Sequence, residues 1–159
     1  MDVLDDEILS LWRALYTEGV RYIMIGGFAT NLHGFARTTA DIDLWVADSQ
    51  ENRIALIKAL NSCGLKHIDA LKHSPLIPGW TSVKLPSGFE LDLMTYAAGL
   101  PAESFDACYE VASVAEIGGI SIRFLHINDL IRSKEAANRP KDQIDLIELK
   151  RIREGGVRD

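Results

Sequence analysis

The sequence YIMIGG at residues 22–27, followed by DIDLWV at residues 41–46, decides the fold. In the first stretch four hydrophobic residues run directly into two glycines, which is the pattern of a buried strand that enters a tight turn. In the second stretch acidic and apolar residues alternate, so Asp41 and Asp43 lie on one face of an extended strand and their apolar neighbours on the other. The chain therefore predicts two strands, with a pair of carboxylates close behind a glycine corner.

Helix and strand patterns alternate along the rest of the chain. Apolar residues spaced by three and four predict a helix over 4–18, and Ser49 is a typical cap for a helix over 50–61. Turn residues indicate two hairpins, one formed by 83–85 with 89–96 and the other by 111–117 with 120–125. Further helices are expected at 28–33, at 102–109, from about 128 to 137, and from 140 onward. This order predicts an α/β (α+β) chain.

The bulk composition predicts one ordinary globular domain. A chain of 159 residues with 47% hydrophobic and 25% charged side chains has room for one core and no signature of disorder. Its apolar runs are shorter than a bilayer span, and its acidic first residues lack the basic flank of a secretory signal, so we expect a cytoplasmic location and no membrane partner. Cys63 and Cys108 form no CxxC pair, which predicts two reduced thiols.

The charge balance bears on the partners. A formal net charge of -6, from 17 basic and 23 acidic side chains, argues against a general phosphate-backbone binder, so DNA is not expected as a partner. The basic residues gather late in the chain, from Arg132 onward, whereas the first stretch to Glu18 is mostly acidic. A basic C-terminal region could therefore lie beside an acidic metal site.

A third carboxylate, Asp92, strengthens the prediction of a metal site. It lies in FELDLM at residues 89–94, where the apolar residues on either side take the opposite face of the strand. If this strand neighbours the first, Asp41 and Asp43 would bridge two Mg²⁺ ions, or Mn²⁺ in their place, while Asp92 completes one metal site and accepts a proton from an attacking hydroxyl. Glu90 shares this face and is a weaker fourth candidate. The alternative to a metal site is that these carboxylates lie on a solvated strand face.

The glycine pair Gly26-Gly27 is a candidate phosphate site. It follows a strand and opens a helix, where backbone N–H groups can bind phosphate. Such a pair is more often only a turn, and neither GxGxxG nor GxxxxGK[ST] is present. The prediction of a phosphate site rests mainly on the Asp41-Ile42-Asp43 motif that follows the glycine pair.

Histidine and tryptophan residues receive structural interpretations. His67, His73 and His126 lack HxH or HxxxH spacing, and His33 precedes a helix-ending glycine. Among the tryptophans only Trp45 shares the face of the acids, and a large aromatic is first a core anchor.

These residues resemble a known superfamily. Ile25-Gly26-Gly27, His33-Gly34, Arg37-Thr38-Thr39 and Asp41-Ile42-Asp43-Leu44 look like the signature of the DNA polymerase β-like nucleotidyltransferases. Within that superfamily the chain is similar to small bacterial abortive-infection (AbiEii-like) toxin nucleotidyltransferases, including the stretch Leu130 to Lys134 and Arg139-Pro140-Lys141-Asp142. The resemblance covers about Tyr22 to Leu149. It implies a nucleotidyltransferase fold with a central mixed β-sheet flanked by helices, and C-terminal helices.

The resemblance also implies site roles and an organisation. A single nucleotidyltransferase domain would span 1–159, with the catalytic sheet and helices at 20–125 and the C-terminal helices at 126–153. Gly26 and Gly27 would hold the triphosphate, and Arg37 with Thr38 would steady phosphates or the loop. Lys134 would contact the triphosphate; a solvated helix lysine is the equally weighted alternative. Where a serine often follows the first glycine in the superfamily, Gly27 offers only its backbone.

The implied reaction moves a nucleoside monophosphate from an NTP such as ATP to a hydroxyl acceptor. The resemblance favours RNA, such as tRNA, or protein as acceptor, a toxin role in a toxin–antitoxin system, and a cognate antitoxin as partner. Acceptor recognition would use the basic C-terminal helices, with Lys150, Arg151 and Arg153, loops near 75–80, or another subunit. Two alternatives remain: a non-catalytic nucleotide- or partner-binding module of the same fold, and a small-molecule nucleotidyltransferase with an aminoglycoside-like acceptor.

Overall fold

A computed structural model of the chain describes residues 6–66, 68 and 80–155. Its helices and strands follow in the order α1 (Asp6–Thr17), β1 (Tyr22–Ile25), α2 (Gly26–Leu32), β2 (Asp41–Val46), α3 (Gln50–Ser62), β3 (Trp80–Lys84), β4 (Glu90–Met94), the 3₁₀ turn η2 (Ala102–Ser104), α4 (Phe105–Val111), β5 (Ser113–Ile117), β6 (Ile120–Phe124), α5 (Ile127–Ala137) and α6 (Pro140–Gly155).

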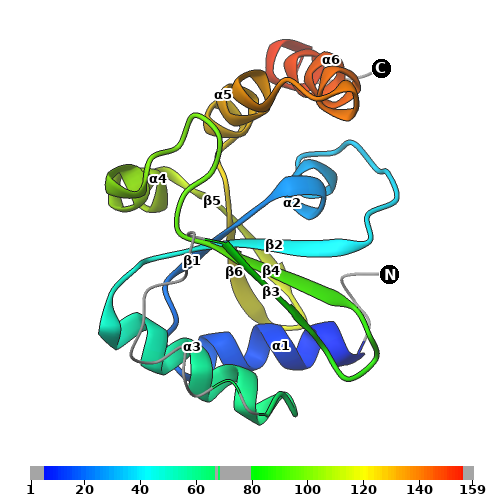
Figure 1. Ribbon diagram of the computed structural model, residues 1–159. Coiled ribbons are helices and arrows are strands. Elements are labelled where there is room, and N and C mark those ends of the chain that lie inside the picture. The colour runs from blue at the N-terminus through cyan, green and yellow to red at the C-terminus, as the bar shows by residue number, and fades with distance from the viewer. Residues whose placement is uncertain (1–5, 67, 69–79, 156–159) are drawn as a thin grey trace.

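The strands form one mixed sheet of six in the order β3-β4-β2-β1-β6-β5 (Figure 1). β2 lies near the middle, antiparallel to β1 and parallel to β4. The two expected hairpins are present as the antiparallel pairs β3–β4 and β5–β6. The expected mixed sheet flanked by helices, with two helices at the C-terminal end, is confirmed.

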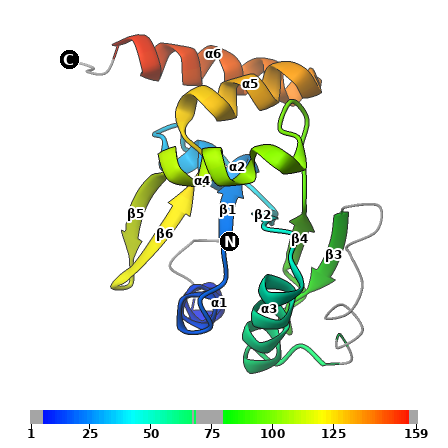
Figure 2. The same ribbon diagram turned by 90° about the vertical axis from the view of Figure 1, so that its left-hand side faces the viewer.

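Helices lie on both faces of the sheet (Figures 1 and 2). α1 and α3 pack side by side on one face, and α2, α5 and α6 lie on the other. The spacing of α1 explains its place, because Ile8, Leu11, Trp12 and Leu15 follow the helical period and are all fully buried. Ser49 caps α3 as expected, by accepting a hydrogen bond from the backbone N–H of Asn52.

Several boundaries differ from the sequence-based expectation; β3, for example, covers Trp80–Lys84 instead of 83–85, and β5 begins at Ser113 instead of 111. α2 begins at Gly26 instead of Phe28, directly after β1, because Gly26 adopts a φ of 72° and turns the chain without an intervening loop. The helix expected over 102–109 is a 3₁₀ turn followed by α4, which continues to Val111. The corrected start of α2 matters for the site, because it places the helix N-terminus at the end of β1.

Two further expectations concern thiols and membranes. Cys63 and Cys108 are both free thiols, as expected. Within the described ranges, none of the helices combines the length and the apolar character that crossing a bilayer requires.

Candidate active site

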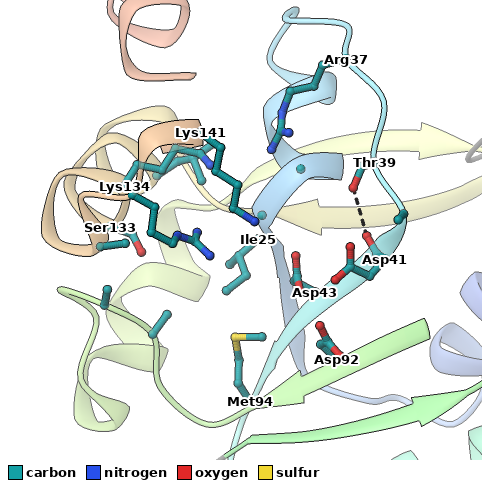
Figure 3. A pocket seen from close by; sticks show the side chains of 18 of the residues that line it. Ile25, Arg37, Thr39, Asp41, Asp43, Asp92, Met94, Ser133, Lys134 and Lys141 are labelled. Carbon is teal, nitrogen blue, oxygen red and sulfur yellow. Dashed lines mark hydrogen bonds between the residues drawn. The ribbon is translucent and has the colours of Figure 1, made fainter. Parts of the chain in front are cut away.

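The parallel pairing of β2 with β4 brings four carboxylates to one face of the sheet. Asp43 lies opposite Asp92, and Asp41 lies opposite Glu90. Residues paired in this way project from the same face, and Figure 3 shows the three aspartates pointing toward one another from the two strands. We call Asp41, Asp43, Glu90 and Asp92 the acid cluster. The convergence expected for the three aspartates is thus present, and Glu90 joins it.

The carboxylates of the acid cluster approach one another closely. Oxygens of Asp41, Glu90 and Asp92 lie within 4.8 Å of one another. Asp92 is only 8% exposed, and its buried Oδ1 has no hydrogen-bond partner in the part of the chain that the structure describes. A buried acceptor without a donor is costly unless something outside the protein satisfies it.

The electrostatics of the cluster disfavour its ionised form. Burial, followed by the negative charges of Asp41 and Asp92, raises the pKa of Asp43 to about 7. Burial and the neighbouring Asp92 also raise the pKa of Asp41. The charge of Lys141 opposes both pKa shifts without cancelling them.

The residues present fit a divalent cation. Carboxylate oxygens are the ligands that Mg²⁺ prefers, and the unpartnered Oδ1 of Asp92 is an available one. A cation among these side chains would stabilise the ionised carboxylates that burial and mutual repulsion now destabilise. Asp41, Asp43 and Asp92 are the side chains that would hold it, with Glu90 next to them.

The two glycines before α2 make room for neighbouring side chains. A Cβ at Gly26 would collide with Oδ2 of Asp43, and a Cβ at Gly27 would lie 2.6 Å from Oγ1 of Thr39. Thr39 in turn donates a hydrogen bond to the backbone oxygen of Asp41 at 3.3 Å (Figure 3). The glycines therefore allow the acid cluster and the 37–41 segment to approach the start of α2, and both also line the cavity beside it.

A cavity of about 680 Å³ opens over the acid cluster. The three aspartates form one wall (Figure 3), and Gly26 also lines the cavity. Basic side chains from α5, α6 and the α2–β2 loop form another wall: Arg37, Lys134, Arg139 and Lys141. Apolar residues complete the lining, among them Met94, Ala97 and Leu130. The cavity thus combines a cation-binding wall, an anion-binding wall and an apolar portion.

Most of the basic wall belongs to a buried ion-pair network, which we call the α6 clamp: Arg37, Lys134, Arg139, Asp142 and Asp145. The Nζ atom of Lys134 lies 2.8 Å from Oδ2 of Asp145 and 3.5 Å from Oδ1 of Asp142. Nε of Arg37 lies 3.1 Å from Oδ1 of Asp145, and Nε of Arg139 lies 2.7 Å from Oδ2 of Asp142. The two aspartates are 0% and 1% exposed, so the clamp joins α5, α6 and the α2–β2 loop inside the protein.

The residues expected to bind phosphate are distributed between the cavity and the clamp. Gly26, Gly27 and Thr38 line the cavity. Lys134 and Arg37 also line it, but their charges are engaged by Asp145. Lys134 is 5% exposed, so the solvated helix lysine that was its alternative interpretation is wrong: α6 covers that face of α5. The phosphate-binding roles of all five residues stay predictions.

Sequence reasoning named Lys141 and Asp142 only as part of the stretch that carries the resemblance, without a role, and did not name Asp145. Asp142 and Asp145 fall on the same stripe of α6 as the buried Leu146 and Leu149. Acids on an apolar helical stripe need buried partners, and that signal could have drawn attention to the clamp. Lys141, one residue before Asp142, has no local feature that distinguishes it from an exposed lysine.

Other candidate side chains have structural contacts. Trp45 shares the face of the aspartates but is fully buried, and its Nε1 donates to the backbone oxygen of Thr95 at 2.9 Å. His33 contacts the backbone oxygen of Leu125 at 2.7 Å, and His126 caps α5 through Nδ1. His67, His73 and residues 75–79 of the expected acceptor loop lie outside the described residues.

The late basic residues are largely neutralised. On α6 the three cations expected to bind RNA each lie next to a glutamate: Lys150 by Glu135, Arg151 by Glu148 and Arg153 by Glu154. Their charges are therefore partly compensated on the surface.

Comparison with known proteins places the chain in a family. No curated protein matches it. Among solved structures, an antigenic nucleotidyltransferase-like protein from Paracoccidioides brasiliensis aligns with a TM-score of 0.49 and 16% identity, over 90% of this chain and 72% of that one. The sequence profile of the family described as "Nucleotidyltransferase of unknown function (DUF6036)" matches residues 3–154. The chain belongs to this family of nucleotidyltransferases of unknown function.

Proposed function

We propose that the protein is a Mg²⁺-dependent nucleotidyltransferase that moves a nucleoside monophosphate from an NTP to a hydroxyl acceptor, with release of pyrophosphate. The family match supports nucleotidyl transfer in general. The single observation that carries the finer proposal is the pairing of Asp43 with Asp92 across β2 and β4, with Oδ1 of Asp92 buried and unpartnered in the described part of the chain. A buried carboxylate oxygen without a partner in the protein is a suitable ligand for a bound cation at a catalytic site.

The side chains divide the chemistry between them. Asp41, Asp43 and Asp92 hold the divalent cations, and Asp92 takes the proton of the attacking hydroxyl. When bound, the cations neutralise charge on the transferred phosphoryl group and lower the pKa of that hydroxyl. Gly26 and Gly27 line the cavity at the start of α2, and their backbone N–H groups are the ones that would contact the phosphates.

The cavity is consistent with an NTP as substrate. Its volume of about 680 Å³ falls within the range of small-molecule sites. A triphosphate can lie between the acid cluster, through divalent cations, and the basic wall, while the apolar residues Met94, Ala97 and Leu130 contact the nucleoside.

The first test is transfer of label from an NTP. Purified protein is incubated with Mg²⁺, a cell extract and each α-³²P-labelled NTP, and labelled products are separated by size and class. We expect wild type to label an acceptor and Asp43→Asn to lose at least about a thousandfold in rate, because several kcal/mol of metal-mediated charge stabilisation disappears. The matched control is Asp106→Asn, an exposed aspartate on α4 outside the cavity. Normal turnover by Asp43→Asn contradicts the proposal.

For the acceptor, we propose RNA or protein, by resemblance to the abortive-infection toxins, with a cognate antitoxin as partner. A cationic small molecule is a second candidate, which the partly neutralised α6 cations and the overall charge of -6 favour. Salt distinguishes them. Labelling of RNA falls steeply with ionic strength and with charge reversal at Arg151, whereas labelling of a small acceptor survives both.

A non-catalytic module of the same fold is the remaining alternative. It would bind NTP in the presence of Mg²⁺ and label nothing in any extract. The acid cluster would hold Mg²⁺ in either case, so transfer of label to an acceptor is the observation that separates the two functions.

A further inference from the structure

The basic wall of the cavity contains four cations in two different electrostatic states. Arg37, Lys134 and Arg139 are held by the two aspartates of the α6 clamp. Lys141 lines the same wall, and across residues 6–66, 68 and 80–155 no carboxylate lies within ion-pair distance of its Nζ. In the described part of the chain, Lys141 is thus the cavity-lining cation whose charge is not already neutralised.

The position of Lys141 directs this charge at the acid cluster. It follows Pro140 in the first turn of α6, and Figure 3 places it across the cavity from Asp41, Asp43 and Asp92. Its positive charge acts on Asp41 and Asp43, because it lowers the pKa of both carboxyl groups. An anion bound between this lysine and cations on the acid cluster would be contacted by positive charge on both sides.

Lys134 is poorly placed for the same task. It is 5% exposed, and its Nζ already contacts both aspartates of the clamp. Moving it toward a phosphate would leave Asp145 or Asp142 buried without one of its cations, which is strongly unfavourable. Lys141 can turn toward a ligand without breaking any ion pair seen in the described residues.

The α6 clamp fixes where Lys141 lies. Asp142 accepts hydrogen bonds from the backbone N–H of Arg139 at 3.0 Å and from its side chain at 2.7 Å, so it caps the first turn of α6. Asp145, one turn later, is tied to α5 through Lys134 and to the α2–β2 loop through Arg37. These contacts on both sides of Lys141 leave its backbone little freedom.

We propose that Lys141 is the residue that contacts the β- and γ-phosphates of the NTP, and that Lys134 serves as a positioning residue within the α6 clamp that holds Lys141 in place. This inference rests on the proposed function and assigns the phosphate contact within it. The resemblance assigns the triphosphate contact to Lys134. We assign it instead to Lys141, which follows the turn between α5 and α6.

The test measures binding of a non-hydrolysable NTP analogue and of the matching NMP, by isothermal titration with Mg²⁺. Loss of one charged contact weakens binding by about tenfold or more. We expect Lys141→Ala to lose that factor for the NTP analogue and less than about twofold for the NMP, which lacks the outer phosphates. Lys141→Arg should retain most of the affinity. The control, Lys58→Ala, removes an exposed cation on the opposite face of the sheet and should bind as wild type does.

A second measurement separates contact from positioning. Thermal unfolding should be unchanged in Lys141→Ala and shifted to lower temperature in Lys134→Met, which removes the buried cation of the clamp. Equal NTP binding by wild type and Lys141→Ala overturns the inference alone, and so does a Lys141→Ala defect of the same size for NMP and NTP. Absence of both NTP binding and transfer in the wild type overturns the proposed function, and this inference with it.

Discussion

Two groups of acids lie beside one cavity, the acid cluster around the buried Asp92 and the buried aspartates of the α6 clamp, and they are compensated in opposite ways. In the α6 clamp, two aspartates are surrounded by three cations of the same chain. In the acid cluster, four carboxylates share one sheet face, and the described residues supply no cation within ion-pair distance of them. The clamp aspartates are charge-compensated within the fold, whereas the carboxylates of the acid cluster are not.

The difference distinguishes structural from functional use of the same side chain. Burying an ionised acid is unfavourable unless hydrogen bonds and opposite charge offset the desolvation. In the clamp that compensation comes from the fold, so losing it should cost stability. In the acid cluster the compensation is missing from the fold, so the carboxylates should weaken the free protein and gain from a bound cation.

The largest expected effect on stability is loss of a clamp aspartate. Asp145→Ala leaves Lys134 buried without its nearest partner, so we expect the free energy of unfolding to fall by about 3–5 kcal/mol, the usual cost of breaking a buried ion pair from one side. Urea denaturation followed by circular dichroism measures it. Asp106→Ala is the control, because its ion pair with Arg21 is exposed and should contribute less than about 1 kcal/mol. Similar losses in the two variants would remove the distinction drawn for the clamp.

A divalent cation should stabilise the protein only through the acid cluster. At free Mg²⁺ a hundredfold above its Kd, the gain is about 2.7 kcal/mol. We expect that shift in wild type and in Lys58→Ala, and its absence in Asp43→Asn. Without Mg²⁺, Asp43→Asn should be at least as stable as wild type, because it removes a carboxylate whose burial is unfavourable. If Asp43→Asn unfolds more easily in chelator, the cluster is a structural element like the clamp.

The acid cluster was more accessible to sequence reasoning than the clamp, for a geometric reason. Strand period alone places Asp41 and Asp43 on one face, and the apolar residues around Asp92 place it on a face of its own strand. Whether the faces coincide depends on β4 pairing with β2 and on its register. α3 and β3 separate the two strands along the chain, so the local sequence pattern does not determine their pairing. The prediction that Asp92 joins Asp41 and Asp43 therefore depended on the assumption that β4 lies next to β2.

The clamp depends on packing between helices, which the local pattern leaves open. Lys134 looks like a surface lysine because every residue from Ser133 to Ala137 is small or charged. It is buried only because α6 folds back on α5 and presents two aspartates. Lys141 is the converse, a residue whose local sequence and exposure are ordinary and whose importance comes from what lies across the cavity.

Stability should also depend on pH, with opposite sign for the two groups, and the change within any one pH unit should be smaller than the two effects above. In the acid cluster, burial and repulsion raise the pKa of Asp43 to about 7, above the unfolded value near 3.9. The folded state therefore holds a proton that the unfolded chain has lost, and stability should fall as pH rises from about 4 to 7, by at most about 1.4 kcal/mol per pH unit for this group. In the clamp, burial raises the pKa of Asp142 but its hydrogen bonds from Arg139 outweigh that effect, so the net pKa is lowered. Its contribution is present above the unfolded value and is lost as pH falls below about 4.

Metal-free protein should consequently be most stable between these ranges, near pH 4 to 5, and less stable at pH 8. Urea titrations at half-unit steps of pH, in chelator, measure the profile. Asp43→Asn should reduce the decline above pH 4, to which Asp41 also contributes, and leave the acid limb of the clamp intact. Saturating Mg²⁺ should reverse the sign of the upper limb, since the cation competes with the proton for the same carboxylates and binds better as pH rises. A wild-type profile that is flat from pH 4 to 8 in chelator would mean that Asp43 is already charge-compensated in the free protein, and the contrast with the clamp would then not hold.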